Sequence, residues 1–553
     1  HAWRGIMIGQ MKDLVFLDIE TTMDHQKIHL VVTNANGIIK CHRDPQSLKK
    51  EIQGKILVAH NGIGFDYPVL NRVWGLRIKL HQVLDTLVLS RLLNPMRTKH
   101  SLASWGEDLG FPKTEFNQFD QYSEEMRQYC INDVKVLERV YNQLIMEKKK
   151  HGFDETSIQL EHEVCAIVSK QVSRGFKLNV EGCERLCGVL SGRMEEICEG
   201  LQKSFQPIVY QRVSEKTGKP LKDYIEEFNP ASRQQISKRL QAVGWKPKKF
   251  TEKGSVIVDE SVLRGVDIPE AKLICEYLLL QKRLSQVTSW IEAVSDKHRV
   301  HGKVITNGAV TGRMTHHSPN LAQIPSVNAE YGSECREQWV VDPSYKLVGI
   351  DASGLELRML AHYMNDEEYT REVVDGDIHT KNQLAAGLDT RAKAKTFIYA
   401  FLYGAGAKKI GSITGTNGAS IIKKFMKNVP ALAELKEKIT VNLENKGTLP
   451  GLDGRRLFIR SEHAALNTLL QGAGAIVMKK ALVIFNKYIK LYELDAHFVA
   501  NVHDEWQLEV KEEDAELVGQ LGVRSIVNAG EVLKLNCPLD GEYKVGNNWK
   551  ETH

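Results

Sequence analysis

At two widely separated places in this chain, a short apolar run of strand character leads directly into acidic residues. The first run is Leu14–Glu20, which contains Asp18 and Glu20, and the second is Lys346–Asp351. Residues i and i+2 of a strand lie on the same face, so Asp18 and Glu20 can hold one cation between them. The two runs predict two buried strands that position carboxylates, and the fold must accommodate both.

The chain is long enough for several domains. Its 553 residues exceed the size at which one hydrophobic core stops growing, and we expect three or four domains. The sequence has no run of eighteen or more apolar residues and no secretory signal pattern, and we predict no membrane span. The first ten residues precede a natural-looking start at Met11 and are interpreted as a remnant of cloning or of genomic sequence.

Charge and cysteine content allow a nucleic-acid enzyme without requiring one. The net charge is +5, but affinity for nucleic acid depends on where Lys and Arg cluster rather than on their sum. The nine cysteines form no CxxC pair, which predicts reduced thiols in a cytosol and no zinc site.

Residues 11 to about 150 alternate strand-like and helix-like segments, which predicts an α/β domain of nuclease type. The predicted strands are Leu14–Ile19, Ile28–Val32 and Ile56–His60, and the predicted helices are Leu84–Leu93 and Ser123–Lys148. The basic run Lys148–Lys150, which leads to Gly152, is interpreted as a linker.

Residues 155 to 300 are dominated by amphipathic helical patterns. The predicted helices are Ile158–Arg174, Val180–Phe205, Ser232–Val243 and Glu270–Ser295. A polar segment, Tyr210–Asn229, lies between the second and third helices. Four lysines follow Trp245, and they fit either a solvated surface or phosphate contact along a duplex. They are Lys246, Lys248, Lys249 and Lys253.

Two further acids can complete a metal site with Asp18 and Glu20. Asp66 lies in an HNxxxFDxPxL segment, and Asp133 follows Tyr129 by one helical turn. Hydrolysis of a phosphodiester needs an activated water and charge neutralisation at the leaving oxygen, which two divalent ions held by carboxylates supply. Each acid alone is more often a surface residue or a helix cap. Together they form a pattern that resembles the DEDDy-type 3′–5′ exonucleases, in which Tyr129 would help to orient the attacking water.

The second acidic run has a partner far along the chain. Phe498–Val510 alternates on both sides of a polar centre and predicts a β-hairpin with Asp504 near its turn. If this hairpin and the strand that ends at Asp351 are neighbours, Asp351 and Asp504 converge on one pair of metal ions. Phosphoryl transfer then needs mainly positioning and electrostatic stabilisation.

A helix between these segments carries two cations followed by two aromatic residues on one face. They recur every four residues and are Arg391, Lys395, Tyr399 and Tyr403. Asp389 and Thr390 cap this helix, and Gly404 ends it. The face fits a nucleotide whose phosphates meet the cations, but an amphipathic helix with a basic rim explains the same pattern.

In their order along the chain, these segments resemble the family A DNA polymerases. The motifs are Thr311–Arg313, Pro319–Pro325, Asp351–Arg358, Arg391–Gly404, Asn467–Gly472 and His503–Glu505. Asp377–Gln383 and Lys395–Tyr399 are closer still to the replicative polymerases of T-odd podophages. The resemblance covers nearly the whole chain, from Met11 to His553.

The resemblance implies an α/β multidomain fold, in which an RNase H-like exonuclease domain precedes a right-hand polymerase with a helical thumb, an antiparallel-sheet palm and helical fingers. The implied limits are 11–150 for the exonuclease domain, 151–300 for the thumb, 301–365 and 451–553 for the two parts of the palm, and 366–450 for the fingers. The implied activities are primer extension with dNTPs and 3′–5′ proofreading.

The resemblance also implies roles for residues of the polymerase site. Asp351 and Asp504 would bind metal, with Glu505 beside them, and Glu356 would exclude a ribose 2′-hydroxyl. The incoming triphosphate would be bound by Arg391, Lys395 and His379, and Lys395 could protonate the pyrophosphate. Tyr399 would contact the sugar and Tyr403 the template side of the new pair. The primer–template would be contacted, partly through minor-groove acceptors, by Arg313, Gln323, Asn467, Gln471 and His503.

The implied cofactor is Mg²⁺, two ions at each centre, for which Mn²⁺ can substitute. At the nuclease centre the implied ligands are Asp18, Glu20, Asp66 and Asp133. The implied partners are primer–template DNA, dNTPs, a phage helicase–primase and a single-strand binding protein, in the cytoplasm of an infected bacterium.

Some segments depart from the family pattern. Tyr210–Asn229 is too short for the insertion that recruits host thioredoxin in podophage relatives, so we expect no such dependence. Ala400 stands where the family usually has Gly. We also expect no 5′-nuclease domain before the exonuclease domain.

Four rival classes fit parts of these observations. A nuclease with a non-catalytic C-terminal platform would lack Asp351, Asp504 or Lys395, and a polymerase with a dead exonuclease would lack acids of the first centre; all are present. A single-subunit RNA polymerase is disfavoured by Glu356 and by the attached proofreading domain. A purely structural DNA clamp would need neither centre.

Overall fold

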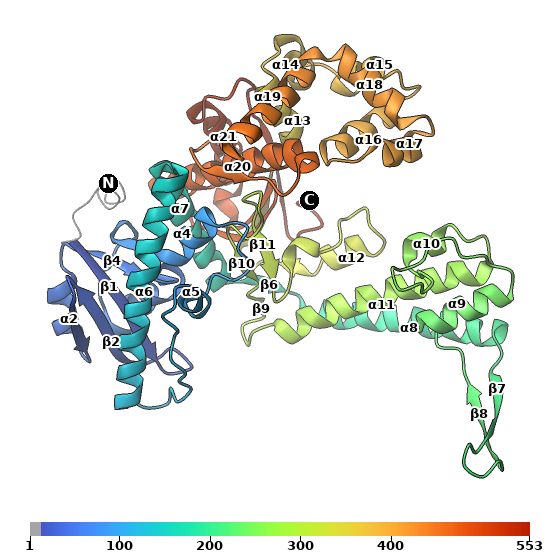
Figure 1. The fold of residues 1–553 in the computed structure, drawn as a ribbon, viewed down its shortest axis with the longest axis horizontal. Coiled ribbons are helices and arrows are strands. Elements are labelled where there is room, and N and C mark those ends of the chain that lie inside the picture. The colour runs from blue at the N-terminus through green and yellow to red at the C-terminus, as the bar shows by residue number, and fades with distance from the viewer. Residues whose placement is uncertain (1–12) are drawn as a thin grey trace.

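The computed structural model describes residues 13–553, and Figure 1 shows how its parts are arranged. The predictions about residues 1–10 and a start at Met11 lie outside the described residues. A sheet-based unit near the N-terminus is followed by a long helical arm, a second sheet-based unit and a helical unit that stands above it (Figure 1). The predicted multidomain α/β fold is confirmed.

The N-terminal unit is built on a five-stranded sheet in the order β3-β2-β1-β4-β5. Its strands are β1 (Leu14–Thr21), β2 (Ile28–Ala35), β3 (Ile38–His42), β4 (Ile56–Ala59) and β5 (Val83–Asp85). Strands β1 to β3 are antiparallel, and β4 and β5 run parallel to β1. Successive side chains of β1 enter two different cores, with Phe16 in one and Leu17 in the other, so both faces of the sheet are covered.

Two of our predictions in this unit are wrong. The predicted helix Leu84–Leu93 begins only at Thr86, as α4 (Thr86–Leu93), because Leu84 belongs to β5 and the side chain of Asp85 caps the helix. The run Lys148–Lys150 is not a linker but the last turn of α6 (Glu124–His151), which ends at Gly152 with φ of 67°. Cations at a helix C-terminus interact favourably with the helix dipole.

The next helix, α7 (Glu155–Arg174), packs against both sheet-based units, because it contacts α4 and also two elements of the second unit, α20 (Ala465–Leu491) and β16 (Ala496–Val502). A helix shared in this way belongs to neither unit alone. The residue limits predicted for the domains therefore remain predictions.

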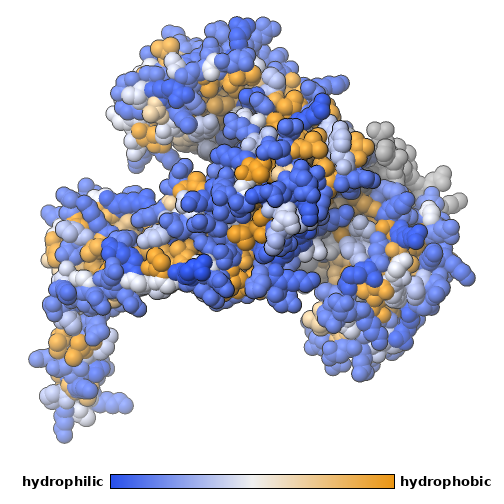
Figure 2. All heavy atoms as spheres, turned by 180° about the vertical axis from the view of Figure 1, so that it is seen from behind, coloured by the Kyte–Doolittle hydropathy of each residue, from blue (hydrophilic) through white to orange (hydrophobic). Residues whose placement is uncertain are grey.

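The helical arm consists mainly of α8 (Val180–Ser204) and α11 (Pro269–Ala293), which pack along each other. The shorter helices α9 (Arg233–Ala242) and α10 (Glu260–Arg264) complete it. The polar segment that we predicted between the helices contains a hairpin, β7 (Ile208–Val213) and β8 (Pro220–Glu226), which projects from the arm (Figure 1). Apolar side chains are exposed along it, as the space-filling view shows (Figure 2).

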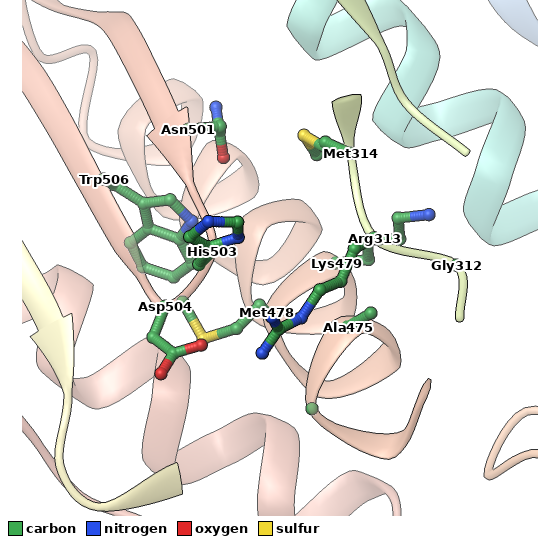
Figure 3. A pocket seen from close by; sticks show the side chains of 11 residues that line it. Gly312, Arg313, Met314, Ala475, Met478, Lys479, Asn501, His503, Asp504 and Trp506 are labelled. Atoms are coloured by element: carbon green, nitrogen blue, oxygen red, sulfur yellow. The ribbon is translucent and has the colours of Figure 1, made fainter. Parts of the chain in front are cut away.

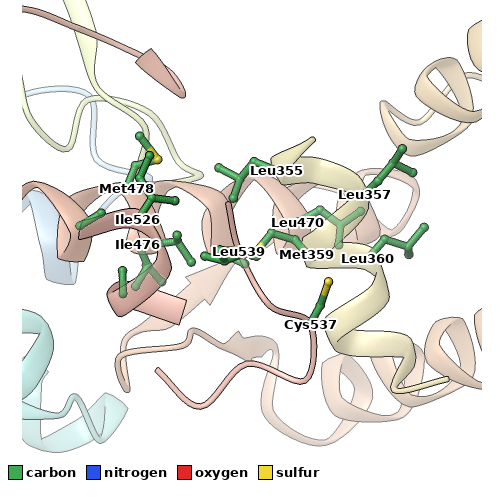
Figure 4. Close-up of a cluster of buried hydrophobic side chains, with 14 of the residues drawn as sticks. Leu355, Leu357, Met359, Leu360, Leu470, Ile476, Met478, Ile526, Cys537 and Leu539 are labelled. Atoms are coloured by element: carbon green, nitrogen blue, oxygen red, sulfur yellow. The ribbon is translucent and has the colours of Figure 1, made fainter. Parts of the chain in front are cut away.

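The second sheet has the order β16-β17-β13-β18 and is antiparallel. Its other strands are β17 (Glu505–Lys511), β13 (Tyr345–Ala352) and β18 (Gly541–Gly546). Two further helices, α13 (Leu355–Met364) and α21 (Ala515–Val532), share with α20 the buried core shown in Figure 4. By length and composition, the segment Glu462–Leu491 could cross a membrane, but 72% of the window that qualifies is buried inside the protein.

The helical unit above this sheet is the block that we predicted from Asp366 to Glu444. Its helices are α14 (Glu367–Val374), α15 (Ile378–Ala386), α16 (Arg391–Leu402), α17 (Ala407–Thr414), α18 (Gly418–Asn428) and α19 (Pro430–Lys446). In Figure 1 it lies on the same side of the molecule as the helical arm, and the second sheet is at the base between them.

Two candidate carboxylate centres

The first centre is formed on the face of β1 that looks toward α6. Asp18 and Glu20 follow Leu14 and Phe16 at a spacing of two, and that face packs against α6. Cys130 of α6 lies within 3.5 Å of Asp18 Oδ2, and burial raises the pKa of its thiol, so the protonated thiol donates a weak hydrogen bond. Ligand atoms of Asp18, Glu20 and Cys130 all lie within 4.8 Å of one another.

Asp66 is delivered by a turn that Asp85 organises. The Asp85 carboxylate accepts hydrogen bonds from the backbone N–H groups of Asn61, at 2.9 Å, and Ile63, at 3.2 Å. These bonds hold the start of a π-helical turn, η2 (Gly62–Asp66), which leads into α3 (Tyr67–Trp74). Asp66 is 5% exposed, and its Oδ1 atom is buried without a hydrogen-bond partner among the described residues.

Asp133 reaches the same centre from α6, one turn after Tyr129. It is 3% exposed, and its carboxyl group interacts directly with that of Asp18. Its Oδ1 atom is also buried and has no partner in residues 13–553. The structure thus gathers all five residues that we predicted for this centre.

Burial raises the pKa of each of the four acids above its ordinary value. For Glu20, Asp66 and Asp133, the next contribution is repulsion from Asp18. Buried carboxylates that repel one another and have unpartnered oxygens form a set of hard ligands suited to Mg²⁺. The residues therefore fit a divalent ion at this centre.

Besides Cys130 and Asp85, sequence reasoning missed Lys113 at this centre. Its Nζ lies 3.2 Å from Asp133 Oδ2 and 5.1 Å from the centroid of the Tyr129 ring. Nearby carboxylates, first Asp133, raise its pKa above the ordinary value against the opposing effect of burial. Lys113 follows no periodic pattern, so no sequence signal marks it.

The second centre lies where β13 and the β16–β17 hairpin meet. Asp351 on β13 is paired in register with Glu505 on β17, and Asp504 occupies the two-residue turn of the hairpin. The backbone N–H of Ala352 donates to the carbonyl oxygen of Asp504 at 3.0 Å. Both the hairpin and its adjacency to the strand of Asp351 agree with our prediction.

Glu505 is held by three side chains that sequence reasoning missed. Its Oε2 accepts hydrogen bonds from Trp549 Nε1, at 2.8 Å, and Gln507 Nε2, at 2.9 Å, and its Oε1 lies 2.6 Å from His553 Nδ1. Burial would raise the pKa of Glu505, but these bonds keep it below its ordinary value. Both oxygens of Glu505 are thus engaged by the protein.

Burial, followed by repulsion from Glu505, raises the pKa of Asp351 to about 7. Burial also raises the pKa of Asp504. Because the oxygens of Glu505 are engaged in hydrogen bonds, Asp351 and Asp504 are the carboxylates available as ligands to a cation. This pair too fits a divalent ion.

A cavity next to Asp504 brings in further predicted residues (Figure 3). The predicted residues Arg313 and His503 line it together with Asp504, and so does Lys479, which sequence reasoning missed. Arg313 also lies 3.5 Å from Glu356, at the start of α13. Burial raises the pKa of Glu356, and interaction with the Tyr403 hydroxyl opposes this increase.

The predicted triphosphate residues gather on the facing helices of the upper unit. Arg391 forms an ion pair with Asp377 at 2.9 Å. The rings of His379 on α15 and Tyr399 on α16 are 6.0 Å apart. Burial lowers the pKa of His379, as do the charges of Arg391 and Lys395. Among the described contacts, no hydrogen bond or ion pair joins this group to Asp351 or Asp504.

The other predicted residues are spread around the second centre. Gln323 is exposed in a short 3-10 helix, η4 (Leu321–Gln323), that packs beside β16. Asn467 and Gln471 lie one turn apart near the start of α20, and Asn467 lines a cavity together with Gly404. The structure describes no direct contact between these side chains and Asp504.

Comparison with known proteins gives consistent results. A family model described as DNA polymerase family A matches residues 201–551. The chain is 35% identical to the DNA-directed DNA polymerase of Enterobacteria phage T3 and 34% identical to that of Escherichia phage T7, each over 92% of this chain and 94% of the relative. It superimposes with a TM-score of 0.80 on the POL domain of Pol1 from M. smegmatis, solved in complex with DNA primer-template and dNTP. That alignment covers 97% of this chain and 95% of the other at 19% identity, and bears on the fold alone.

Proposed function

Because the chain belongs to DNA polymerase family A and is a DNA-directed DNA polymerase of the phage T7-like type, we propose that it has two separate carboxylate centres. The two centres catalyse opposite reactions. The Asp351–Asp504 centre extends a primer with dNTPs, and the centre of Asp18, Glu20, Asp66 and Asp133 removes nucleotides from the 3′ end. The observation that carries this proposal is the presence of two clusters of buried acids on different sheets.

At the Asp351–Asp504 centre, the chain's own residues position the reactants. Family A polymerases depend on metal ions, and two Mg²⁺ at Asp351 and Asp504 would activate the primer hydroxyl and neutralise charge on the phosphates. Glu505, held by Trp549 and His553, is paired in register with Asp351 on the neighbouring strand. Arg313 and His503 line the adjacent cavity, where they would contact the primer–template.

The incoming nucleotide would be bound between the upper helical unit and the palm. Arg391 and Lys395 supply positive charge for its phosphates, and His379, whose lowered pKa favours the neutral ring, can donate a hydrogen bond to them. Lys395 can donate a proton to the pyrophosphate leaving group. Tyr399 and Glu356 would enclose the sugar, and the effect of burial and of the Glu356 charge, which raise the pKa of Tyr399, supports this placement. Glu356 would then exclude a 2′-hydroxyl. Tyr403, Gln323, Asn467 and Gln471 complete the proposed contacts to the base pair and the strands.

The nuclease centre would hydrolyse the terminal phosphodiester of a single-stranded 3′ end. The unpartnered Oδ1 atoms of Asp66 and Asp133 support an ion held between β1 and α6. Tyr129, one turn before Asp133, is suited to orient the attacking water. A proofreading nuclease together with a polymerase matches replication of a phage genome in the cytoplasm of an infected bacterium, alongside a helicase–primase and a single-strand binding protein.

We also propose that this polymerase works without thioredoxin. The segment between α8 and α9 holds only the β7–β8 hairpin, and this observation supports the absence of a long recruiting insertion. Primer extension on a long single-stranded template, with and without added thioredoxin, tests it. A longer product in the presence of thioredoxin would contradict the proposal.

One assay tests the two-centre proposal. A labelled primer–template with Mg²⁺ and dNTPs should be extended, and the same primer without dNTPs should be shortened. Asp351→Ala should abolish extension and keep shortening, whereas Asp18→Ala with Glu20→Ala should do the reverse. Asp296→Ala, at an exposed aspartate, serves as the control and should change neither. Loss of both activities in one folded variant would show that the centres are not separate.

A further inference from the structure

Lys113 is delivered to the nuclease centre by a segment without regular secondary structure, between α5 (Leu102–Asp108) and α6. The segment is nevertheless anchored. The carbonyl oxygen of Phe119 lies 2.7 Å from His29 Nε2, and the ring of Phe116 lies 5.3 Å from that of Tyr129. The segment is therefore fixed by contacts three and six residues after Lys113.

The ammonium group of Lys113 stands among the carboxylates without occupying all of their oxygens. It interacts with Oδ2 of Asp133 at 3.2 Å, while Oδ1 of Asp133 remains buried and without a partner among the described residues. The side chain of Lys113 is 26% exposed and that of Asp133 is 4% exposed. The ammonium group is thus bound to one oxygen of Asp133, and the other oxygen is left free.

The same ammonium group also lies beside Tyr129, 5.1 Å from its ring centroid. Lys113 therefore touches both α6 residues of the centre, which are separated by one helical turn. Partners of this kind, which hold a metal-binding carboxylate without binding the metal, orient the ligand and contribute to activity.

We propose that Lys113 is a positioning residue of the nuclease centre, whose ammonium group holds Asp133 and Tyr129 in the arrangement required for hydrolysis and balances the carboxylates while ions exchange. This inference rests on the proposed 3′–5′ exonuclease function. The ammonium group of Lys113 has two separate effects in this arrangement. Its positive charge repels an incoming cation, but its contacts align the carboxylate of Asp133 and the ring of Tyr129.

The two effects have opposite consequences when the charge is removed. Lys113→Met keeps most of the aliphatic side chain but loses the ammonium group. Cation binding at the centre should become several-fold tighter because a repelling charge is gone. Hydrolysis should become about 10- to 100-fold slower because Asp133 and Tyr129 are no longer held. A residue with only a structural role would weaken both.

Cation binding is measured without turnover, by titrating Mn²⁺ and recording free Mn²⁺ by electron paramagnetic resonance. The background carries Asp351→Ala and Asp504→Ala, so that the nuclease centre is the one under test. Hydrolysis is measured on a single strand labelled at its 5′ end. Lys55→Met, which removes a half-buried lysine that pairs with Asp13 away from the centre, is the control and should match the parent protein in both measurements. Lys113→Arg, which retains the charge, should recover part of the hydrolysis rate.

The possible outcomes are distinct. Unchanged hydrolysis in Lys113→Met, or weaker Mn²⁺ binding together with slower hydrolysis, overturns the role of Lys113. If Lys113→Met does not fold, as judged by loss of primer extension in the otherwise unmodified protein, Lys113→Gln replaces it with the same two criteria. If Asp18→Ala with Glu20→Ala still degrades single strands, the exonuclease proposal itself fails, independently of Lys113.

Discussion

Replacing Glu161 with glutamine should strongly destabilise the protein. Glu161 on α7 is fully buried, and its Oε1 atom pairs with Arg455 Nη1 at 2.8 Å and with Lys479 Nζ at 2.7 Å. Arg455 is also held by Asp453 at 2.7 Å. The network joins α7 to α20 and to the turn between β14 (Thr448–Pro450) and β15 (Arg456–Phe458), so it fastens the helix that both sheet-based units share.

The magnitude follows from the charge left behind. In Glu161→Gln, Arg455 keeps Asp453, but Lys479, whose side chain is 2% exposed, loses the only carboxylate within ion-pair distance in residues 13–553. Removing one partner of a buried ion pair costs about 3–5 kcal/mol, a large part of a total stability of roughly 5–15 kcal/mol. By contrast, Asp389→Asn breaks the exposed Asp389–Lys393 pair and should leave stability close to that of the unmodified protein.

The effect should also depend on pH. Burial lowers the pKa of Lys479 below its ordinary value of 10.5, and Glu161 opposes this decrease. A lower pKa in the folded state means that the unfolded state holds the proton more tightly, so stability rises as pH increases from the folded pKa toward 10.5. Without Glu161 the pKa of Lys479 in the folded state falls further. Between that lower pKa and the pKa of Lys479 in the folded unmodified protein, the difference in unfolding free energy between the two proteins should therefore shrink as pH increases.

Urea unfolding of both proteins and of the Asp389→Asn control, followed by circular dichroism at pH 7 and pH 9, measures these free energies. The double variant Glu161→Leu with Lys479→Met should lose much less stability than Glu161→Gln, since a buried ion pair can be replaced by apolar residues of similar size. A deficit below about 1 kcal/mol at pH 7, or one that grows with pH, would refute the reasoning.

Two further substitutions test the polymerase site. Glu356→Ala should reduce discrimination against ribonucleotides roughly 10- to 200-fold, measured as the ratio of kcat/KM for dATP and ATP, and an unchanged ratio would remove Glu356 from the sugar site. His553→Ala removes the 2.6 Å contact to Glu505. It should slow nucleotide incorporation about 10- to 100-fold and leave hydrolysis of single strands unchanged. Normal incorporation would show that Trp549 and Gln507 hold Glu505 unaided.

Much of the architecture follows from local patterns in the sequence. Alternation along Leu14–Glu20 puts Asp18 and Glu20 on one face, and helical spacing puts Tyr129 and Asp133 on another, because side-chain direction repeats every two residues in a strand and every 3.6 in a helix. The hairpin at Asp504 and the helical block above the palm were predictable for the same reason. Asp85 shows the limit of such patterns, since it lies at the boundary between β5 and α4 and only the sheet decides where the helix begins.

By itself the sequence predicted which residues would carry the chemistry and determined which face of each element they occupy, because the face depends on neighbours a few positions away. Tertiary structure alone decided which groups surround them. Lys113 beside Asp133, His553 against Glu505 and Lys479 against Glu161 join residues that are 20, 48 and 318 positions apart. Such contacts depend on how whole strands and helices pack, and periodicity records the direction of a side chain but not the partner that it meets.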